Sequence, residues 1–506
     1  MQRSTSLICL ALLATGCARN DDYNTEYGAD PSGSSDGYGY ADSTESAMDT
    51  GSQADGEEEP TADTGETEDT AEPGECDEAE ALTLYLSPDD SNSMSSPVQA
   101  RAAILGGYTS LNQVQVRTWE FFNYYTFDYP QPTNGEDLGL TVDMVASPDN
   151  PEELVLQIGV KSPTPTERLP LNITLVLDTS GSMSGVPIDM LREASRSIAA
   201  SLATGDIVSM VTWSATQIPI LSGHPVTGPN DETLLSAINA IESGGGTDLS
   251  GGLEVGYGVA MDNHDAGRIN RVVLISDGGA NMGITDEEII GKYAGTQDRD
   301  GIYMVGIGVG EAGGYNDVLM DNVTDAGKGA SVFIPSAAEA EFILEDRFIS
   351  TMDVFARDVA VSLDLPAGFE IVQFSGEEYS TDPSEIEPQH LSPDDAMVFY
   401  QTLGHCDAES LTGTEVIGVT VNYKDAITFE SKSFSESYTI DELQGSDSAL
   451  LLKGAAIYAY AEGLKAWQRG DQEAVLPMEQ ALERAEELSP SDADLAEIRS
   501  VIDALE

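Results

Sequence analysis

Between residues 171 and about 352, apolar runs alternate with amphipathic segments at the spacing of strands and helices. Runs in which nearly every residue is apolar predict strands that are buried on both faces, as a parallel sheet requires. The predicted strands are 172–177, 206–213, 271–275, 302–307 and 330–334, and the predicted helices are 187–202, 231–241, 247–262, 285–296, 316–326 and 337–352. This alternation is typical of a Rossmann-like, doubly wound α/β domain with a mostly parallel sheet, which we place at residues 169–353.

On both sides of this unit the pattern changes to a period of two, which indicates antiparallel, half-buried strands. The β-rich regions are residues 76–168, with strand-like runs at 81–86, 139–145 and 153–160 and a helix ending in 116–125, and residues 354–444, with runs at 358–364, 396–400, 415–422 and 426–429. One arrangement that fits is a single sandwich into which the α/β unit is inserted. Residues 445–506 are predicted to form a pair of helices, near 446–469 and 471–505.

The N-terminal part of the chain differs from the rest. Residues 1–17 combine Arg3, a short apolar run and small residues before Cys17, which is the pattern of an export signal. The apolar run is too short to span a membrane. Residues 18–75 are rich in Asp, Glu, Ser, Thr and Gly without apolar periodicity, which predicts a disordered acidic tether.

Residues 13–17, Leu-Ala-Thr-Gly-Cys, resemble a bacterial lipobox. The resemblance implies cleavage before Cys17 and lipidation of that cysteine. The residue after the cysteine is Ala18 and not Asp. In Gram-negative lipoproteins this implies the outer membrane. A plain secretory signal with an incidental cysteine is the alternative.

Cysteine use follows from this hypothesis. Cys9 leaves with the signal, so Cys76 and Cys406 remain in the folded part. Outside the cytoplasm they either pair as a disulfide or stay free and buried. Pairing fits a sandwich built from both flanking regions.

The charge balance is strongly acidic, with 22 Lys+Arg against 89 Asp+Glu and a formal net charge of -67. Such a surface repels nucleic acid and anionic lipid, so we expect no nucleic-acid partner and membrane contact only through the lipid anchor. It also favours hard cations such as Mg²⁺ and Ca²⁺. A heavily solvated surface is the simpler interpretation of the acidity.

Oxygen-bearing side chains follow three of the predicted strands. Asp178, Ser180 and Ser182 come directly after strand 172–177, at the carboxyl end where open α/β sheets place their ligand sites. Thr247 follows a Gly-Gly-Gly loop, and Asp277 follows strand 271–275. Carboxylates and hydroxyls without Cys or His are ligands for a hard divalent cation, so these residues predict a site for Mg²⁺, or for Mn²⁺ or Ca²⁺.

These five residues resemble the metal-ion-dependent adhesion site (MIDAS) of von Willebrand factor type A (VWA) domains. The resemblance implies that Ser180, Ser182 and Thr247 contact the metal through hydroxyls, and that Asp178 and Asp277 hold it mainly through waters. Neutral hydroxyls leave the ion electrophilic, so a protein ligand is expected to contribute a carboxylate to it.

A wider stretch, about 85–506, resembles the bacterial YfbK-like subfamily of VWA proteins. The resemblance is carried by residues 117–125, by 308–310 with 315–318, and by the region that begins at Asp353. It implies a fold and a metal, but it names no ligand.

Other motifs do not indicate an enzyme. Gly308-x-Gly310-x-x-Gly313 matches a dinucleotide fingerprint, but no acidic residue follows the next strand to bind a ribose. The residues 262–267 resemble the start of a calcium loop without its closing Glu, and the four histidines have no ligand spacing. We therefore expect a cell-envelope lipoprotein that binds a protein ligand. The alternatives are a scaffold or accessory subunit of a metal- or ATP-dependent envelope complex, and a hydrolase in the flanking β regions.

Overall fold

The computed structural model describes residues 80–88, 92–108, 110–133, 136–165, 168–279, 302–444 and 448–505. All of these belong to one compact unit, Thr70–Glu506. The predicted export signal, tether, Cys17, Cys76 and helix 285–296 lie outside the described residues and stay predictions.

The central part of the unit is a six-stranded sheet of order β6-β5-β4-β7-β8-β9. Five strands are parallel, namely β4 (Leu171–Asp178), β5 (Ile207–Trp213), β7 (Ile269–Ser276), β8 (Tyr303–Val309) and β9 (Ser331–Ile334). Every residue of β4, β7 and β8 is buried, which explains their continuous apolar runs. The predicted doubly wound, mostly parallel sheet is confirmed.

The edge strand β6 (Gln217–Pro225) was not predicted. It pairs antiparallel with β5, and five of its nine residues are exposed. Its sequence carries two prolines and a glycine, residues that are depleted in strands and tolerated at edges. Neighbouring-strand pairing, rather than an apolar pattern, makes this segment a strand.

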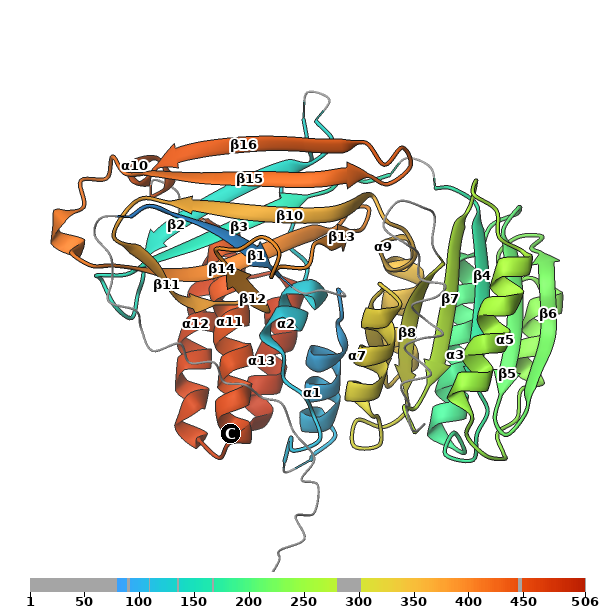
Figure 1. The fold of residues 1–506 in the computed structure, drawn as a ribbon. Coiled ribbons are helices and arrows are strands. Elements are labelled where there is room, and N and C mark those ends of the chain that lie inside the picture. The colour runs from blue at the N-terminus through green and yellow to red at the C-terminus, as the bar shows by residue number, and fades with distance from the viewer. Residues whose placement is uncertain are drawn as a thin grey trace, which may run out of the picture. The chain divides into compact units, whose positions relative to one another are not determined.

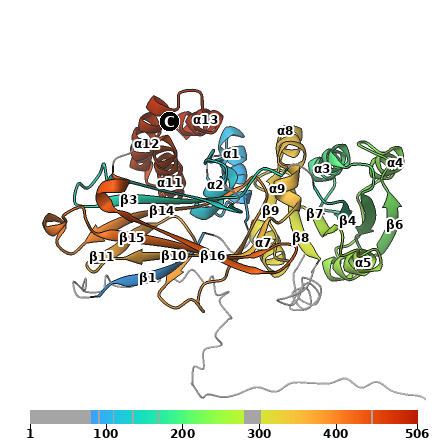
Figure 2. The ribbon, with the colours of Figure 1, turned by 90° about the horizontal axis from the view of Figure 1, so that it is seen from above.

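Helices cover both faces of this sheet. Figure 2 shows α3 (Val186–Ser201), α8 (Ala337–Glu341) and α9 (Phe348–Met352) on one face, and α5 (Leu249–Asp262) and α7 (Asp317–Ala326) on the other. The short helix α4 (Glu232–Asn239) packs beside α3. The segment that we predicted as one helix over 337–352 is divided by a π-helical turn at Phe342–Asp346.

The flanking β regions form two antiparallel sheets, stacked in Figure 1. The first has the order β12 (Glu378–Ser380), β1 (Leu82–Ser87), β10 (Ala356–Leu365), β15 (Val416–Asp425) and β16 (Ser431–Thr439), with β13 (Gln389–Leu391) also paired to β10. The second has the order β11 (Phe369–Phe374), β14 (Ala396–His405), β3 (Leu154–Lys161) and β2 (Gly139–Ala146). Each sheet joins strands from before and after the α/β unit, so that unit is inserted into a single sandwich.

The prediction of a strand at 426–429 was wrong. These residues form the turn between β15 and β16 instead. The Asp425 carboxylate accepts hydrogen bonds from the backbone N–H groups of Ile427 (3.1 Å) and Thr428 (2.8 Å), and Phe429 has a positive φ of 58°. Side-chain capping of a turn by Asp therefore overrides the apolar alternation.

The remaining helices pack together beside the sandwich. They are α1 (Ser95–Leu105), α2 (Thr118–Tyr124) and the C-terminal α11 (Ala449–Gln468), α12 (Val475–Leu488) and α13 (Ala493–Leu505), whereas the short α10 (Ile440–Leu443) packs on β2 and β16 of the sandwich. The segment predicted as one helix at 471–505 is therefore mainly two, because the Asp492 side chain accepts the N–H groups of Asp494 and Leu495 and starts a new helix. Phe121 of α2 packs edge-to-face on Tyr460 of α11 at 5.4 Å, so the aromatic run at 117–125 lies in the core.

Two further observations concern the envelope hypothesis. Within the described residues, no helix is both long enough and apolar enough to span a bilayer. Cys406 is disulfide-bonded, and it follows β14 directly. The three other cysteines lie outside the described residues, so its pairing with Cys76 stays a prediction.

Candidate metal-binding site

The first strand of the parallel sheet ends in a buried carboxylate. Asp178 is the last residue of β4, and no part of it is exposed. One carboxylate oxygen accepts a hydrogen bond from the Ser180 N–H at 2.8 Å, and the other accepts one from the Ser276 hydroxyl at 2.7 Å. Thr179 donates through both its N–H (2.8 Å) and its hydroxyl (3.0 Å) to the Trp213 carbonyl. The loop after β4 is therefore fixed to the ends of two neighbouring strands.

Hydroxyls connect this loop to the second predicted carboxylate. The Ser180 and Ser182 hydroxyl oxygens lie 3.0 Å apart, and Ser182 donates to Asp277 Oδ1 at 3.3 Å. The same Oδ1 accepts the Gly279 N–H at 2.8 Å. Asp178, Ser180 and Asp277 are buried, while Ser182 is exposed. The structure thus brings together four of the five predicted residues.

The fifth predicted residue, Thr247, lies on an adjoining loop. That loop is attached to the first by two backbone hydrogen bonds, from the Gly244 N–H to the Thr179 carbonyl (2.7 Å) and from the Gly181 N–H to the Gly245 carbonyl (3.3 Å). Thr247 itself is exposed and precedes α5 by two residues. Exposed hydroxyls thus stand at the outer side of the cluster, and buried carboxylates lie beneath.

Two glycines after Asp277 allow this close packing. A Cβ on Gly279 would lie 2.8 Å from Asp277 Oδ1 and 2.9 Å from the Ser182 hydroxyl. Gly278 has a φ of +72°, and a Cβ there would lie 2.6 Å from the Asn316 carbonyl oxygen. Side chains at either position would displace the oxygen cluster or the loop that holds it.

The electrostatics of the cluster are those of a site that lacks positive charge. Burial raises the pKa of Asp178 to about 6, against the opposing effect of its hydrogen bonds from Ser180 and Ser276. The nearby Asp277 charge raises this pKa further. Among the described residues, no Lys, Arg or His forms an ion pair with either carboxylate. A divalent cation would supply the missing charge, and the oxygen donors fit one.

This donor set differs from that of a metal centre in which three or more His, Cys, Asp or Glu side chains bind the ion. Across the part of the chain that the structure describes, no group of three His, Cys, Asp or Glu side chains could hold a metal ion. Any metal at the β4 loop would therefore depend on hydroxyls and waters for most of its coordination.

Sequence reasoning missed the residues that support the site. Ser276 directly precedes the predicted ligand Asp277, but only the structure shows that its hydroxyl donates to the Asp178 carboxylate. The Asn316 N–H donates to the Asp277 carbonyl at 3.2 Å, and the next residue, Asp317, is paired with Arg117 at 2.6 Å. The segments 117–125 and 315–318, which we noted separately, are thus in direct contact.

The glycines of the dinucleotide-like motif have packing roles. A Cβ on Gly308 would lie 2.2 Å from the Tyr315 ring, and one on Gly310 would lie 3.3 Å from Pro187. Tyr315 stacks on Phe333 with ring centroids 4.6 Å apart. The glycines therefore accommodate neighbouring side chains.

Comparison with known families agrees with this geometry. Residues 173–280, which contain all five predicted ligands, match the family model described as von Willebrand factor type A domain. This part of the chain is a VWA domain. The matched residues begin in β4 and end just beyond the Asp277 loop.

Curated relatives cover a larger part of the chain. The uncharacterized protein YfbK of Escherichia coli is 25% identical over 259 residues, which are 49% of this chain and 44% of that protein. The uncharacterized protein sll0103 of Synechocystis is 23% identical over 219 residues, or 43% of this chain and 50% of that protein. The chain thus spans half or less of the length of these relatives, and it is a distant homologue of YfbK.

Solved structures give matches of low similarity. A von Willebrand factor type A protein from Catenulispora acidiphila is 16% identical with a TM-score of 0.44, over 72% of this chain and 89% of that chain. The ArnB paralog VWA2 from Sulfolobus acidocaldarius is also 16% identical, with a TM-score of 0.40, over 73% of this chain and 98% of that chain.

Proposed function

We propose that this chain is a cell-envelope lipoprotein that binds a protein ligand through a divalent cation, Mg²⁺ or Mn²⁺ or Ca²⁺, in its VWA domain. VWA domains commonly serve adhesion and protein binding. The observation that supports the metal most directly is the cluster of carboxylate and hydroxyl oxygens at the carboxyl edge of the sheet. Two acids lie there without a basic partner among the described residues.

The arrangement divides the ligands into two sets. Ser180, Ser182 and Thr247 would hold the ion through neutral hydroxyls, and Asp178 and Asp277 would hold it mainly through waters. With few negative ligands in direct contact, the ion keeps its attraction for a further carboxylate. Because Ser182 and Thr247 are exposed, a partner's acidic side chain can approach from their side.

The negative charge of the chain opposes an acidic partner only weakly at physiological salt. Repulsion between exposed charges that are more than about 8 Å apart is then largely screened. A metal–carboxylate contact is shorter than that distance. Binding should therefore persist or strengthen when moderate salt is added, whereas a simple acid–base contact would weaken.

Two measurements test the metal and the partner separately. Calorimetric titration with Mg²⁺ or Mn²⁺ should give one site in the wild type and none in Asp178→Ala. Asp189→Ala is the matched control, because Asp189 is an exposed acid on α3 whose side chain is paired only with Arg192 in the described part. The control should bind metal as the wild type does. Metal binding by Asp178→Ala that equals the wild type would reject the site.

The partner is tested by capture from solubilised envelopes. The wild type should retain a protein in the presence of Mg²⁺ and lose it with chelator, and Asp178→Ala should retain none under either condition. Equal capture under all four conditions would show that the loop after β4 is not the binding surface.

The envelope location has its own test. Replacing Cys17 by Ser should leave the precursor uncleaved or release the protein from the membrane fraction, because the lipid is attached to that thiol. Normal processing and membrane retention of the variant would contradict the lipoprotein hypothesis.

A further inference from the structure

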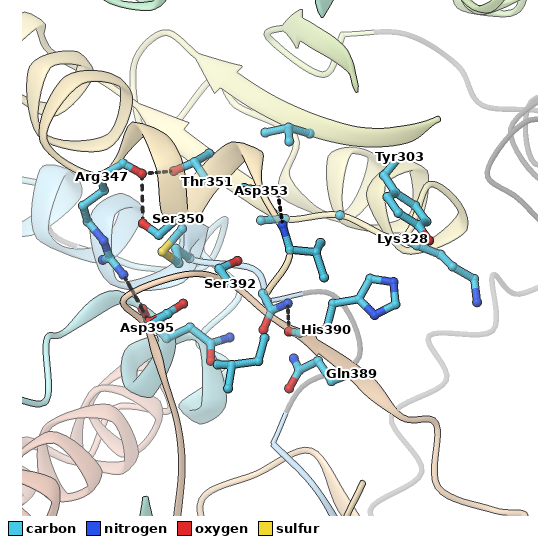
Figure 3. Close-up of a pocket in the computed structure, with 18 of the residues that line it drawn as sticks. Tyr303, Lys328, Arg347, Ser350, Thr351, Asp353, Gln389, His390, Ser392 and Asp395 are labelled. Carbon is cyan, nitrogen blue, oxygen red and sulfur yellow. Dashed lines mark hydrogen bonds and ion pairs between the residues drawn. The ribbon is translucent and has the colours of Figure 1, made fainter. Parts of the chain in front are cut away.

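A cavity of about 50 Å³ lies at the edge of the parallel sheet opposite to the metal loop. Arg271 and Tyr303, near the starts of β7 and β8, line it together with Gln389 and His390 of β13 in the sandwich. Figure 3 shows Tyr303, Gln389 and His390 gathered on one side of this cavity, with Lys328 beside them. The cavity is therefore lined jointly by the VWA domain and the sandwich.

Arg271 carries a buried charge without a carboxylate partner. The residue is 7% exposed, and within the described residues no acid lies within 4 Å of its guanidinium nitrogens. Its guanidinium donates a hydrogen bond to the Asn270 carbonyl at 2.9 Å and stacks over the Tyr303 ring at 5.1 Å. Burial lowers the pKa of Arg271 to about 10, and the more distant Asp353 offsets this only in part. An unpaired buried cation is costly, so a counter-charge is expected nearby.

Two further donors at this cavity have no acceptor within the described part of the chain. His390 packs edge-on to Tyr303 at 5.2 Å, and its Nδ1 accepts the Asp358 N–H at 3.3 Å. The ring proton therefore stands on Nε2, which is buried and has no partner among the described residues. The side-chain amide of Gln389 is also buried, and neither its nitrogen nor its oxygen has a described partner. Buried polar groups of this kind are rarely left unsatisfied in proteins.

The basic residues of the cavity differ in the hydrogen bonds and ion pairs that they already form. Arg347 already donates to the carbonyls of Tyr124 (2.7 Å) and Asn123 (3.3 Å) and lies 3.9 Å from Asp395. Lys328 is 45% exposed and lies 3.8 Å from Glu387. Among these, Arg271 is the buried cation whose charge lacks an ion-pair partner. The carboxylates of Asp353 and Asp395 line the same cavity, and among the described residues neither lies within 4 Å of the Arg271 guanidinium nitrogens.

We propose that this cavity binds a small oxyanion, a carboxylate or an inorganic phosphate, between Arg271, the His390 Nε2–H and the Gln389 amide. A planar guanidinium matches two oxygens of such an anion, and neutral N–H donors complete its hydrogen bonding. The bound anion bridges the VWA domain and the sandwich, and it removes the cost of the unpaired charge.

A second cavity gives this site an approach. It has a volume of about 350 Å³ and shares Asn92, Lys328 and His390 with the first. These three residues therefore stand between the two cavities. Asp325 and Glu387 also line the outer cavity, so it serves as a path, and the buried donors of the inner cavity hold the anion.

The test is calorimetric titration of the purified full chain with sodium phosphate and with sodium acetate, at constant ionic strength and with chelator present. At least one of the two anions should bind at one site and raise the melting temperature. Arg271→Met should weaken binding by at least tenfold, because a charge-assisted hydrogen-bond donor is lost. Without anion, this variant should melt at the wild-type temperature or above it, because a buried unpaired charge has been removed.

His390→Phe keeps the ring contact with Tyr303 and removes only the Nε2 donor, so it serves if Arg271→Met does not fold. It should also weaken binding by about tenfold. Arg499→Met, which alters an arginine paired with Glu486 on the C-terminal helices, should bind as the wild type does. Absence of binding by both anions, or equal affinity in wild type, Arg271→Met and His390→Phe, would overturn the proposal. Asp178→Ala should leave the anion affinity unchanged, so this site and the metal site can fail independently.

Discussion

At the scale of single residues, the protein buries acidic side chains in its interior. Glu120 on α2 has no exposed surface, and its carboxylate accepts the Ser96 N–H at 2.6 Å and the Arg117 guanidinium at 2.8 Å. Burial raises the pKa of Glu120 to about 8, and the nearby Asp317 charge raises it further, while Arg117 opposes both. One arginine thus serves several buried acids, and a proton supplies the remaining positive charge.

Because of this raised pKa, the free energy of unfolding falls as the pH rises. The folded carboxyl holds its proton up to about pH 8, whereas the unfolded one loses it near 4.5. Between these values the unfolded state binds fewer protons, so the free energy of unfolding falls as pH rises, by at most about 1.4 kcal/mol per pH unit. Thermal melts across this range should show the slope in the wild type and a smaller slope in Glu120→Gln.

The exposed Glu232 on α4 offers a matched control for the same experiment. Glu232→Gln should keep the wild-type slope. A wild-type slope that persists in Glu120→Gln would assign the pH dependence to another group.

At the scale of elements, the helix α2 is attached to the VWA domain by charge. Arg117, the residue before α2, pairs with Asp317 at 2.6 Å and with Asp321 at 2.9 Å, both on α7. The residue before α7, Asn316, donates its N–H to the backbone carbonyl of Asp277, a predicted metal ligand. The segment 117–125 is therefore connected through the start of α7 to a predicted metal ligand.

Arg117→Met should lower the free energy of unfolding by about 3–5 kcal/mol, because it leaves the buried Asp317 carboxylate without its cation and removes the hydrogen bond to Glu120. Arg499→Met removes a more exposed pair with Glu486 and should cost about 0–1 kcal/mol. Denaturant titration at neutral pH measures both values. Equal losses in the two variants would show that the cluster around Arg117 is not a structural junction.

At the scale of the whole molecule, the VWA domain is an insertion in a sandwich whose sheets each combine N-terminal and C-terminal strands. β1 pairs with β10 across the insertion, with Leu84 opposite Leu363. The sandwich can therefore form only when strands distant in the sequence meet. A covalent link between the two flanks would favour that meeting by reducing the entropy of the unfolded chain.

Cys406 is disulfide-bonded, and we predict that its partner is Cys76. Peptide mapping without reductant should give one linked pair containing both residues. Reduction should lower the free energy of unfolding by about 2–4 kcal/mol. Recovery of Cys76 as a free thiol from native protein would contradict the pairing.

The sequence by itself predicted the parallel sheet, and it placed the candidate metal ligands at the ends of its strands. Strands buried on both faces are mostly apolar, so 172–177, 271–275 and 302–307 could be predicted without any tertiary information. Asp178 and Asp277 could be proposed as ligands because they stand at the ends of two paired strands, β4 and β7, at one edge of the sheet. Local pattern and local chemistry agree at these positions.

Only the tertiary structure decided the features that depend on partners far along the chain. The edge strand β6 has little apolar pattern and forms by pairing with β5, whereas 426–429 has the pattern and forms a turn capped by Asp425. The contact of Ser276 with Asp178 and the burial of Arg271 against Tyr303 and His390 join residues from separate elements. Long-range packing determines which polar groups are buried together, so a local sequence pattern cannot predict these contacts.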